Sequence, residues 1–217
     1  MSTLRSNNDD ARAYHHGNLR ESLIEEARRV IEQGGTQALT LRDLGERLGV
    51  SRTAPYRHFR DRKALLSAVA QRSATDFCQV LLLARLGAGN ALARLQAMGQ
   101  AFLLFAHDDS CGYRLMFQEP ELLQEPEAEL KQTMNQAFDE LRLMVEECQR
   151  EGVLKAEEPR LMSTYIWSVM HGIATLAMDQ RLHAQTDSKV LGDYAQRMLF
   201  EGIGVKSLGT LWQKLSQ

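Results

Sequence analysis

Apolar side chains recur every three or four residues along most of the chain, and this spacing predicts helices. Residues 18–33 carry one such stripe, which Gly34 and Gly35 end; it is formed by Leu19, Leu23, Ala27, Val30 and Ile31. No stretch shows the sustained alternation of apolar and polar residues that marks a half-buried strand. The pattern therefore predicts an all-α protein.

The same spacing divides the rest of the chain into helices. They are expected at 41–48, 52–59, 61–86, 90–107, 127–150, 161–177 and 188–201, with a short helix at 113–117 in a loop-rich stretch. The 161–177 segment is apolar nearly all round, so it must be covered on every side. We expect neighbouring helices on one flank and a second subunit or a ligand cavity on the other.

Composition and charge narrow the class of protein. The 217 residues are 44% hydrophobic and 25% charged, as in ordinary soluble domains, and the three cysteines are far apart, which favours a reducing, cytoplasmic location. No apolar run approaches a membrane span, and the first ten residues are too polar for a signal peptide. Residues 1–72 hold 13 Lys/Arg and 9 Asp/Glu, whereas the remainder has a net charge of −6. A basic head on an acidic body suits an anionic partner, although a net charge of +4 is not large.

Residues 41–59 have the pattern of a helix-turn-helix. Two short helices flank Gly49-Val50-Ser51, and glycine suits the turn because it tolerates a positive φ. A small core is expected from Leu44, Leu48, Val50 and Phe59. The exposed residues of the second helix are types that bind phosphates and base edges: Arg52, Thr53, Tyr56, Arg57 and His58. A surface helical hairpin with solvated charges has the same pattern, so both interpretations stay open on spacing alone.

Pro55 is the anomaly of this segment. A proline in a helix interior removes a hydrogen bond and costs about 3 kcal/mol. In the first turn of a short helix few backbone donors have helical partners, so the cost there is small. Whether Pro55 costs one bond depends on whether the helix begins at residue 51 or 52.

These residues resemble the TetR family of bacterial transcriptional regulators. The resemblance runs through TLRDLGERLGVS at 40–51, YRHF at 56–59 and RKALL at 62–66, and extends back over residues 14–35. It is weaker in the body, where GYRLMF at 112–117 and Trp167-x-x-x-His171-Gly172 resemble a subgroup named for a Trp-His-Gly motif. It implies an N-terminal three-helix helix-turn-helix head and a C-terminal helical body that binds a ligand and dimerises.

The resemblance also implies roles in DNA binding. Arg42 would reach a base or a phosphate, and Thr40, Tyr56 and His58 would hold phosphates. Arg52, Thr53 and Ala54 would face base edges, and Arg62 stands where the family usually has a lysine that meets a phosphate. The full set predicted to bind DNA is Thr40, Arg42, Ser51, Arg52, Thr53, Ala54, Tyr56, Arg57, His58 and Arg62. Residues 12–17 are a further candidate contact with the DNA backbone or minor groove.

The body is rich in methionine and aromatic residues, which suit an adaptable apolar pocket. Those predicted to point inward and bind a ligand are Phe102, Phe105, Met116, Phe117, Met134, Phe138, Trp167 and Met170, with His171 as a polar anchor. The alternative is that each of them is ordinary core. By resemblance, the last helix would complete a four-helix dimer interface with its symmetry mate.

The sequence gives little evidence of a metal site or a catalytic site. His107 and Cys111 lack a second ligand cluster, so residues 107–111 are expected to form a surface loop, without a metal. No nucleophile elbow, phosphate loop or zinc-protease motif occurs, and Glu146 and Glu147 are expected on an exposed helix face. We predict no cofactor and no enzymatic activity.

Together these features predict a flexible arm at 1–13, a helix-turn-helix domain at 14–62 and an effector-binding and dimerisation domain at 63–217. The predicted protein is a one-component transcriptional regulator, a repressor. It binds a palindromic operator as a homodimer and is released by a small, apolar effector. Two alternatives stay open: a small-molecule-binding or enzymatic helical protein with a vestigial head, and a protein-interaction module.

Overall fold

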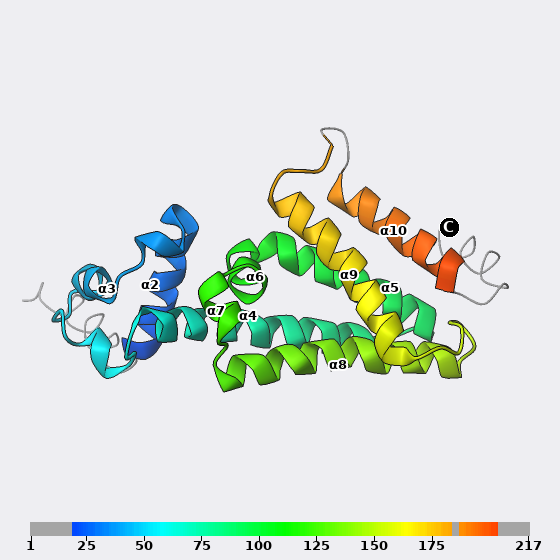
Figure 1. Cartoon of the computed structure of the whole chain (residues 1–217), viewed down its shortest axis with the longest axis horizontal. Coiled ribbons are helices and arrows are strands. Elements are labelled where there is room, and N and C mark those ends of the chain that lie inside the picture. The colour runs from blue at the N-terminus through cyan, green and yellow to red at the C-terminus, as the bar shows by residue number, and fades with distance from the viewer. Residues whose placement is uncertain (1–18, 184–186, 204–217) are drawn as a thin grey trace, which may run out of the picture. The chain divides into compact units, whose positions relative to one another are not determined.

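The computed structural model describes residues 19–183 and 187–203, and every regular element in these ranges is helical. The elements are α2 (Leu19–Gly34), η1 (Thr36–Ala38), α3 (Leu41–Arg47), η2 (Pro55–Arg57), α4 (Arg62–Arg85), α5 (Ala91–Asp108), α6 (Ser110–Phe117), α7 (Pro120–Gln124), α8 (Ala128–Arg150), α9 (Pro159–Met178) and α10 (Ser188–Ile203) (Figure 1). The all-α prediction is confirmed. The predicted arm at 1–13 and the candidate DNA contacts at 12–17 lie outside the described residues.

The chain divides into two compact units, each with its own core. The head unit comprises residues 1–72 and 114–130, and the body unit comprises residues 73–113 and 131–217. These units are defined by packing, so the functional domains at 14–62 and 63–217 stay a prediction. Helices α4, α6 and α8 contribute residues to both units.

Short-range sequence features explain the helices of the head. Helix α2 buries Leu23, Ile24, Ala27, Val30 and Ile31, which is the predicted stripe with Ile24 in place of the half-buried Leu19. Helix α3 begins at Thr40, whose hydroxyl oxygen accepts a hydrogen bond from the Asp43 N–H at 3.1 Å. Such an N-cap stabilises a helix by about 1 kcal/mol, which matters for a helix of only seven residues.

The second helix of the helix-turn-helix differs from the prediction. In place of an α-helix over residues 52–59, the structure has a turn followed by the single 3₁₀ turn η2. Pro55 is the reason, because it has no N–H to donate to the Ser51 carbonyl, and the Ala54 N–H donates to it instead at 3.0 Å. The Arg57 and His58 N–H groups likewise donate three residues back. Pro55 thus stands at the first position of η2, where it removes no helical bond.

In the body, α5, α9 and α10 pack against one another (Figure 1). Two glycines allow the close approach of α5 and α10. A Cβ at Gly99 would lie 2.6 Å from Gln196 Nε2, and one at Gly192 would lie 2.3 Å from Leu103 Cδ1. On the far side of the unit, Arg85 of α4 and Arg94 of α5 form ion pairs with α8. No helix in the described ranges is long and apolar enough to cross a membrane.

Two expectations about polar residues are wrong. Residues 107–111 are no loop, because His107 and Asp108 form the end of α5 and Cys111 lies in α6, with the buried Asp109 between the two helices. The Asp109 carboxylate accepts a hydrogen bond from the Gly112 N–H at 2.9 Å and so caps the start of α6. Glu147 does not lie on an exposed face either, since it is half-buried in ion pairs with Arg85 and Arg94, whereas the Glu146 side chain is 37% exposed and pairs with Arg142 of its own helix.

Candidate nucleic-acid interface and effector pocket

The turn of the helix-turn-helix is shaped by two glycines and Pro55. Gly49 has φ 68°, a left-handed conformation that glycine adopts without strain. A Cβ at Gly45 would lie 3.2 Å from the Ser51 carbonyl oxygen and 3.4 Å from Pro55 Cγ. Pro55 is buried, as are Leu44 and Phe59, whereas Leu48 and Val50 are half-buried. The short η2 segment is thereby held tightly against α3.

Most residues predicted to bind DNA are on the surface of the head. Arg42, Ser51, Arg52, Thr53, Arg57 and His58 are exposed, Tyr56 is 52% exposed, and Ala54 is half-buried. Ser51 Oγ and Thr53 Oγ1 are hydrogen-bonded at 3.3 Å. Thr40 is exposed while it caps α3, so its hydroxyl hydrogen is still available to a phosphate oxygen.

Arg62 stands apart from this set. Its Nη2 donates to the Thr36 carbonyl oxygen at 2.7 Å, and its Nη1 donates to the Glu121 carboxylate. These contacts fasten α4 to η1 and to α7 inside the head unit. In this geometry the Arg62 guanidinium is held by protein acceptors, and a phosphate would have to compete with them.

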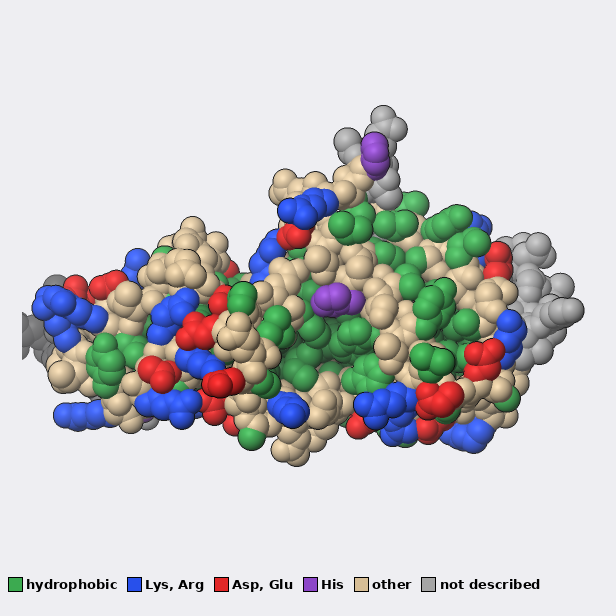
Figure 2. Space-filling view, in the orientation of Figure 1, with side chains coloured by type: hydrophobic (Ala, Val, Ile, Leu, Met, Phe, Trp, Pro, Cys, Tyr) green, Lys and Arg blue, Asp and Glu red, His purple; other side chains and the backbone are tan. Residues whose placement is uncertain are grey.

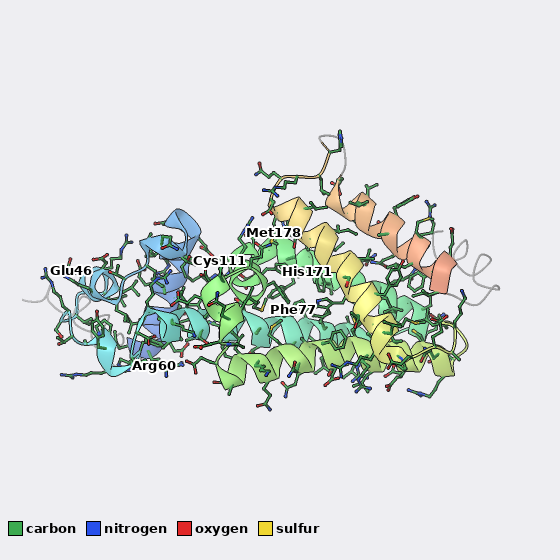
Figure 3. The ribbon with its side chains drawn as sticks, in the orientation of Figure 1. Glu46, Arg60, Phe77, Cys111, His171 and Met178 are labelled. Carbon is green, nitrogen blue, oxygen red and sulfur yellow. The ribbon has the colours of Figure 1, made fainter. Side chains whose placement is uncertain are left out.

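Glu46 is a residue that the sequence reasoning missed. Its carboxylate lies 2.6 Å from Arg52 Nε and 3.9 Å from Arg42 Nε. Figure 3 labels Glu46 in the head. The i, i+4 spacing of Arg42 and Glu46 could have indicated the first contact, but the Arg52 contact depends on the turn. Glu46 therefore orients two of the predicted DNA-binding arginines while the head is free.

The body contains a cluster of aromatic side chains around Trp167. Its indole packs edge-to-face on Phe77 at 5.9 Å, on Phe102 at 5.3 Å and on Phe138 at 5.7 Å between ring centroids. Phe105 packs against Phe77 at 5.0 Å. Figure 2 shows apolar side chains lining a hollow of the body beside a histidine, and Figure 3 labels His171 at that place.

His171 contacts the buried Tyr113 at the edge of this cluster. Its Nδ1 lies 2.7 Å from the Tyr113 hydroxyl, and the two rings stack with centroids 5.6 Å apart. Burial raises the pKa of Tyr113, so the phenol keeps its proton and can donate it to a neutral imidazole. Burial also lowers the pKa of His171, which favours that neutral form.

This arrangement predicts a pH-dependent stability. A histidine that folding keeps neutral binds fewer protons than it does in the unfolded chain, where its pKa is 6.5. Its contribution to stability is therefore complete above pH 6.5 and is lost as the pH falls below that value. We expect the melting temperature of the wild-type protein to fall more steeply in mild acid than that of His171→Asn. Thermal melts of both proteins across this range check it, and a constant difference between them would contradict it.

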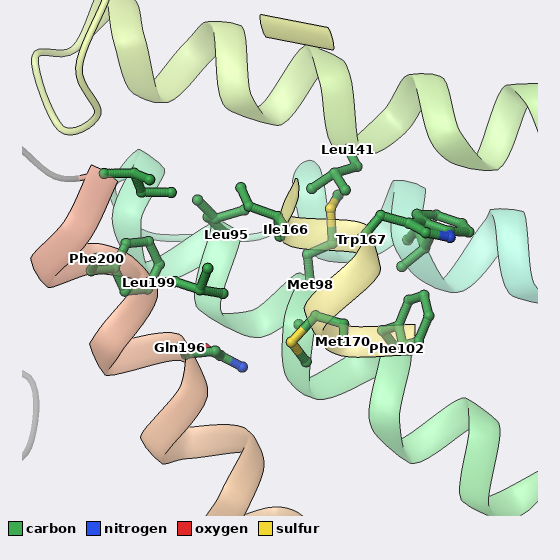
Figure 4. Close-up of a pocket in the computed structure, with 13 residues that line it drawn as sticks. Leu95, Met98, Phe102, Leu141, Ile166, Trp167, Met170, Gln196, Leu199 and Phe200 are labelled. Carbon is green, nitrogen blue, oxygen red and sulfur yellow. The ribbon is translucent and has the colours of Figure 1, made fainter. Parts of the chain in front are cut away.

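Next to the aromatic cluster, the body contains a small, partly open cavity of about 30 Å³ (Figure 4). Three residues predicted to bind a ligand line it: Phe102, Trp167 and Met170. Those that the prediction missed are Leu81, Leu95, Met98, Gly99, Leu141, Ile166, Gln196, Leu199, Phe200 and Ile203. The inward face of α10 supplies four of them, because we had assigned that helix to a subunit interface.

The other predicted ligand residues are spread over both units. Phe105, Phe138 and His171 belong to the aromatic cluster of the body, and Met134 is half-buried on α8. Met116 is buried and Phe117 half-buried, but both belong to the head unit. Within the described residues, no group of His, Cys, Asp and Glu side chains is arranged to hold a metal ion.

Two family models match the chain. The model described as "Bacterial regulatory proteins, tetR family" matches residues 23–69, and "Tetracyclin repressor-like, C-terminal domain" matches residues 95–199. These ranges contain the helix-turn-helix and the residues of the body cavity from Leu95 to Leu199. Neither model bears the Trp-His-Gly name that residues 167–172 suggested, so the finer subgroup stays a prediction.

Several known proteins are similar to this chain in sequence or in fold. The chain is 27% identical to the transcriptional activator FasR of Mycolicibacterium smegmatis over 175 residues, which are 80% of this chain and 78% of FasR. A structure of a protein of unknown function from Rhodococcus sp. RHA1 has a TM-score of 0.78 at 29% identity, covering 88% of this chain and 98% of that one. AibR in complex with isovaleryl coenzyme A and operator DNA has a TM-score of 0.65 at 16% identity, covering 83% and 97%.

Proposed function

Since the chain belongs to the TetR family of DNA-binding transcriptional regulators, which are not enzymes, we propose that it is a repressor whose dimer binds a palindromic operator and is released by a small, apolar effector. The observation that carries this proposal is the head surface. Around η2, exposed hydroxyl, imidazole and guanidinium groups stand on a turn that Gly45, Gly49 and Pro55 hold rigidly. Such groups bind phosphates and base edges.

Dimerisation would be mediated by α9 and α10. Both helices expose large apolar side chains at helical spacing: Leu161, Tyr165 and Leu176 on α9, and Val190, Tyr194 and Met198 on α10. On the same face of α9, a Cβ at Gly172 would meet no atom within 4 Å, which leaves room for a second helix. A dimer also suits an operator with two half-sites, about 34 Å apart for successive turns of DNA.

This face supports a direct test of the dimer. Tyr194→Glu places a charge among the apolar side chains, so we expect the dimer dissociation constant to rise at least about 10-fold. Gln136→Glu adds the same charge at an exposed position of α8 and is the matched control. Sedimentation over a range of concentrations measures both variants. If Tyr194→Glu and Gln136→Glu dissociate alike, α9 and α10 do not form the interface.

The effector would bind in the body, where the cavity and the aromatic cluster around Trp167 adjoin each other. Both are almost wholly apolar, and His171 and Gln196 are polar groups at their edges. AibR, whose structure holds isovaleryl coenzyme A, is a relative of the same fold with a partly apolar ligand. Effector binding would favour a body conformation in which the two heads no longer match successive major grooves.

One experiment tests both operator binding and whether the protein represses or activates transcription. Fragments of the protein's own promoter region are titrated with the full chain at low salt, and the same promoter drives in vitro transcription. We expect specific retardation of these fragments and reduced transcription. Absence of retardation would refute operator binding, whereas retardation with increased transcription would make the protein an activator, as FasR is named.

A further inference from the structure

The cavity of the body contains one polar side chain that the protein leaves unsatisfied. Gln196 of α10 is only 5% exposed, and its Nε2 has no hydrogen-bond partner. Figure 4 shows its amide extending from α10 toward Met170. A buried amide donor without a partner destabilises a protein, so such groups are uncommon in folded chains.

Gly99 creates the space in front of this amide. A Cβ at that position would lie 2.6 Å from Gln196 Nε2 and 3.5 Å from Met170 Cε. Any other residue of α5 at this point would crowd the amide. The combination of a glycine on one helix and a glutamine on the next therefore leaves the donor open to the cavity.

Water is a poor occupant for this cavity. A volume of about 30 Å³ would admit a water molecule or two. A buried water is held by two to four polar partners, however, and in the described part of the lining the Gln196 amide and the Trp167 indole N–H are the only polar side-chain groups. A carbonyl oxygen needs a single donor and about the room of one water, so the acceptor end of an apolar molecule fits this lining better.

We propose that this cavity binds the acceptor end of a neutral, apolar ligand, such as a ketone, ester, thioester or amide, whose carbonyl oxygen accepts from Gln196 Nε2–H. This inference rests on the proposed effector function and names the chemical class of the effector. Among the residues that the structure describes, no charged side chain lines the cavity, so an ionised carboxylate would lose its hydration without a counter-charge. Met98 and Met170 are flexible side chains that can make room for different branched ends.

Three isosteric probes separate the features of this class: 4-methyl-2-pentanone, 3-methylbutanoate and 2,4-dimethylpentane. They share a branched apolar end and differ in carrying a neutral carbonyl, a carboxylate or no polar group. Binding to the full chain is followed through the methyl signals of Met98 and Met170, which line the cavity. At neutral pH we expect the ketone to shift these signals and to bind at least about 10-fold more tightly than the carboxylate.

Gln196→Met tests the role of the amide. Removing the donor should weaken ketone binding about 5-fold and leave the affinity for the hydrocarbon within about 2-fold. The variant should also melt about 4 °C higher without ligand, because it no longer buries an unsatisfied donor. Gly99→Ala is a second variant that keeps the amide but fills the space before it, and it should weaken ketone binding as well. Equal binding of carboxylate and ketone, or a ketone affinity that Gln196→Met leaves unchanged, would overturn the proposal.

Operator release is measured separately by fluorescence anisotropy of labelled promoter DNA. If the ketone binds in a way that depends on Gln196 but the DNA stays bound, the effector function is refuted and the ligand site at Gln196 is supported. If the ketone releases DNA equally from the wild-type protein and from Gln196→Met, the ligand site at Gln196 is refuted and the effector function is supported.

Discussion

Replacing Arg85 by methionine is expected to lower the free energy of unfolding by about 3 kcal/mol. The Arg85 side chain is only 15% exposed, and it bridges two carboxylates of α8. Its Nε lies 2.6 Å from Glu140, and its Nη1 lies 2.7 Å from Glu147. Hydrogen bonding to Glu140 raises the pKa of Arg85 despite burial. Without the guanidinium, two partly buried carboxylates would face each other, and Glu147 would keep only its contact with Arg94.

Arg142→Met is the matched control for this prediction. Arg142 also contacts two acidic residues, Asp139 and Glu146, but it is 31% exposed and all three lie on α8. Exposed pairs of this kind contribute less than about 1 kcal/mol. Urea unfolding of both variants measures the difference, and Arg85→Lys should fall between them because an ammonium lacks the fork that bonds two carboxylates. If Arg85→Met and Arg142→Met lose the same free energy of unfolding, burial does not make the α4–α8 ion pairs more stabilising than the exposed pairs.

The second large effect is expected on DNA binding. The double variant Arg52→Ala/Arg57→Ala should bind operator roughly 1,000-fold more weakly, since the proposed dimer would lose four guanidinium contacts worth about 1 kcal/mol each. If these groups contact phosphates, the slope of log affinity against log salt should become shallower by about 0.9 for each lost contact. If they read bases, discrimination against non-operator DNA should fall while the slope changes little.

The control removes the same charge from the body. Arg150→Ala/Arg160→Ala deletes two exposed arginines of α8 and α9, and it should leave operator affinity within about 3-fold. Anisotropy titrations of both double variants at several salt concentrations make the comparison. An unchanged operator affinity for Arg52→Ala/Arg57→Ala would remove these residues from the interface.

Much of the head could be predicted because its signals are local. Thr40 caps α3 by accepting from the Asp43 N–H, and Gly49 takes the left-handed turn conformation; both features depend on residues within four positions. The core residues Leu44 and Phe59 also followed from spacing. The type of the η2 turn was mistaken, although its cause, the missing N–H of Pro55, was visible in the sequence.

Side chains whose partners are distant in sequence were much harder to assign. Arg62 resembles a phosphate ligand, but Thr36 and Glu121 engage it in the structure. Glu147 looked like a solvated acid, yet it joins a half-buried ion-pair network with Arg85 and Arg94. In each case the role of the side chain depends on a partner at least 25 residues away in the sequence. The spacing of apolar residues along the chain does not indicate such a partner.

By itself, the sequence determined the helical class, the order of the helices and the helix-turn-helix, because hydrophobic period, caps and turn residues act over one or two turns. The tertiary structure alone decided which polar groups are free to bind and which are already engaged. Gln196 shows the difference most clearly. On an amphipathic helix it looks like a surface residue, but the packing of α10 on α5 buries its amide at an apolar cavity, which only the fold creates.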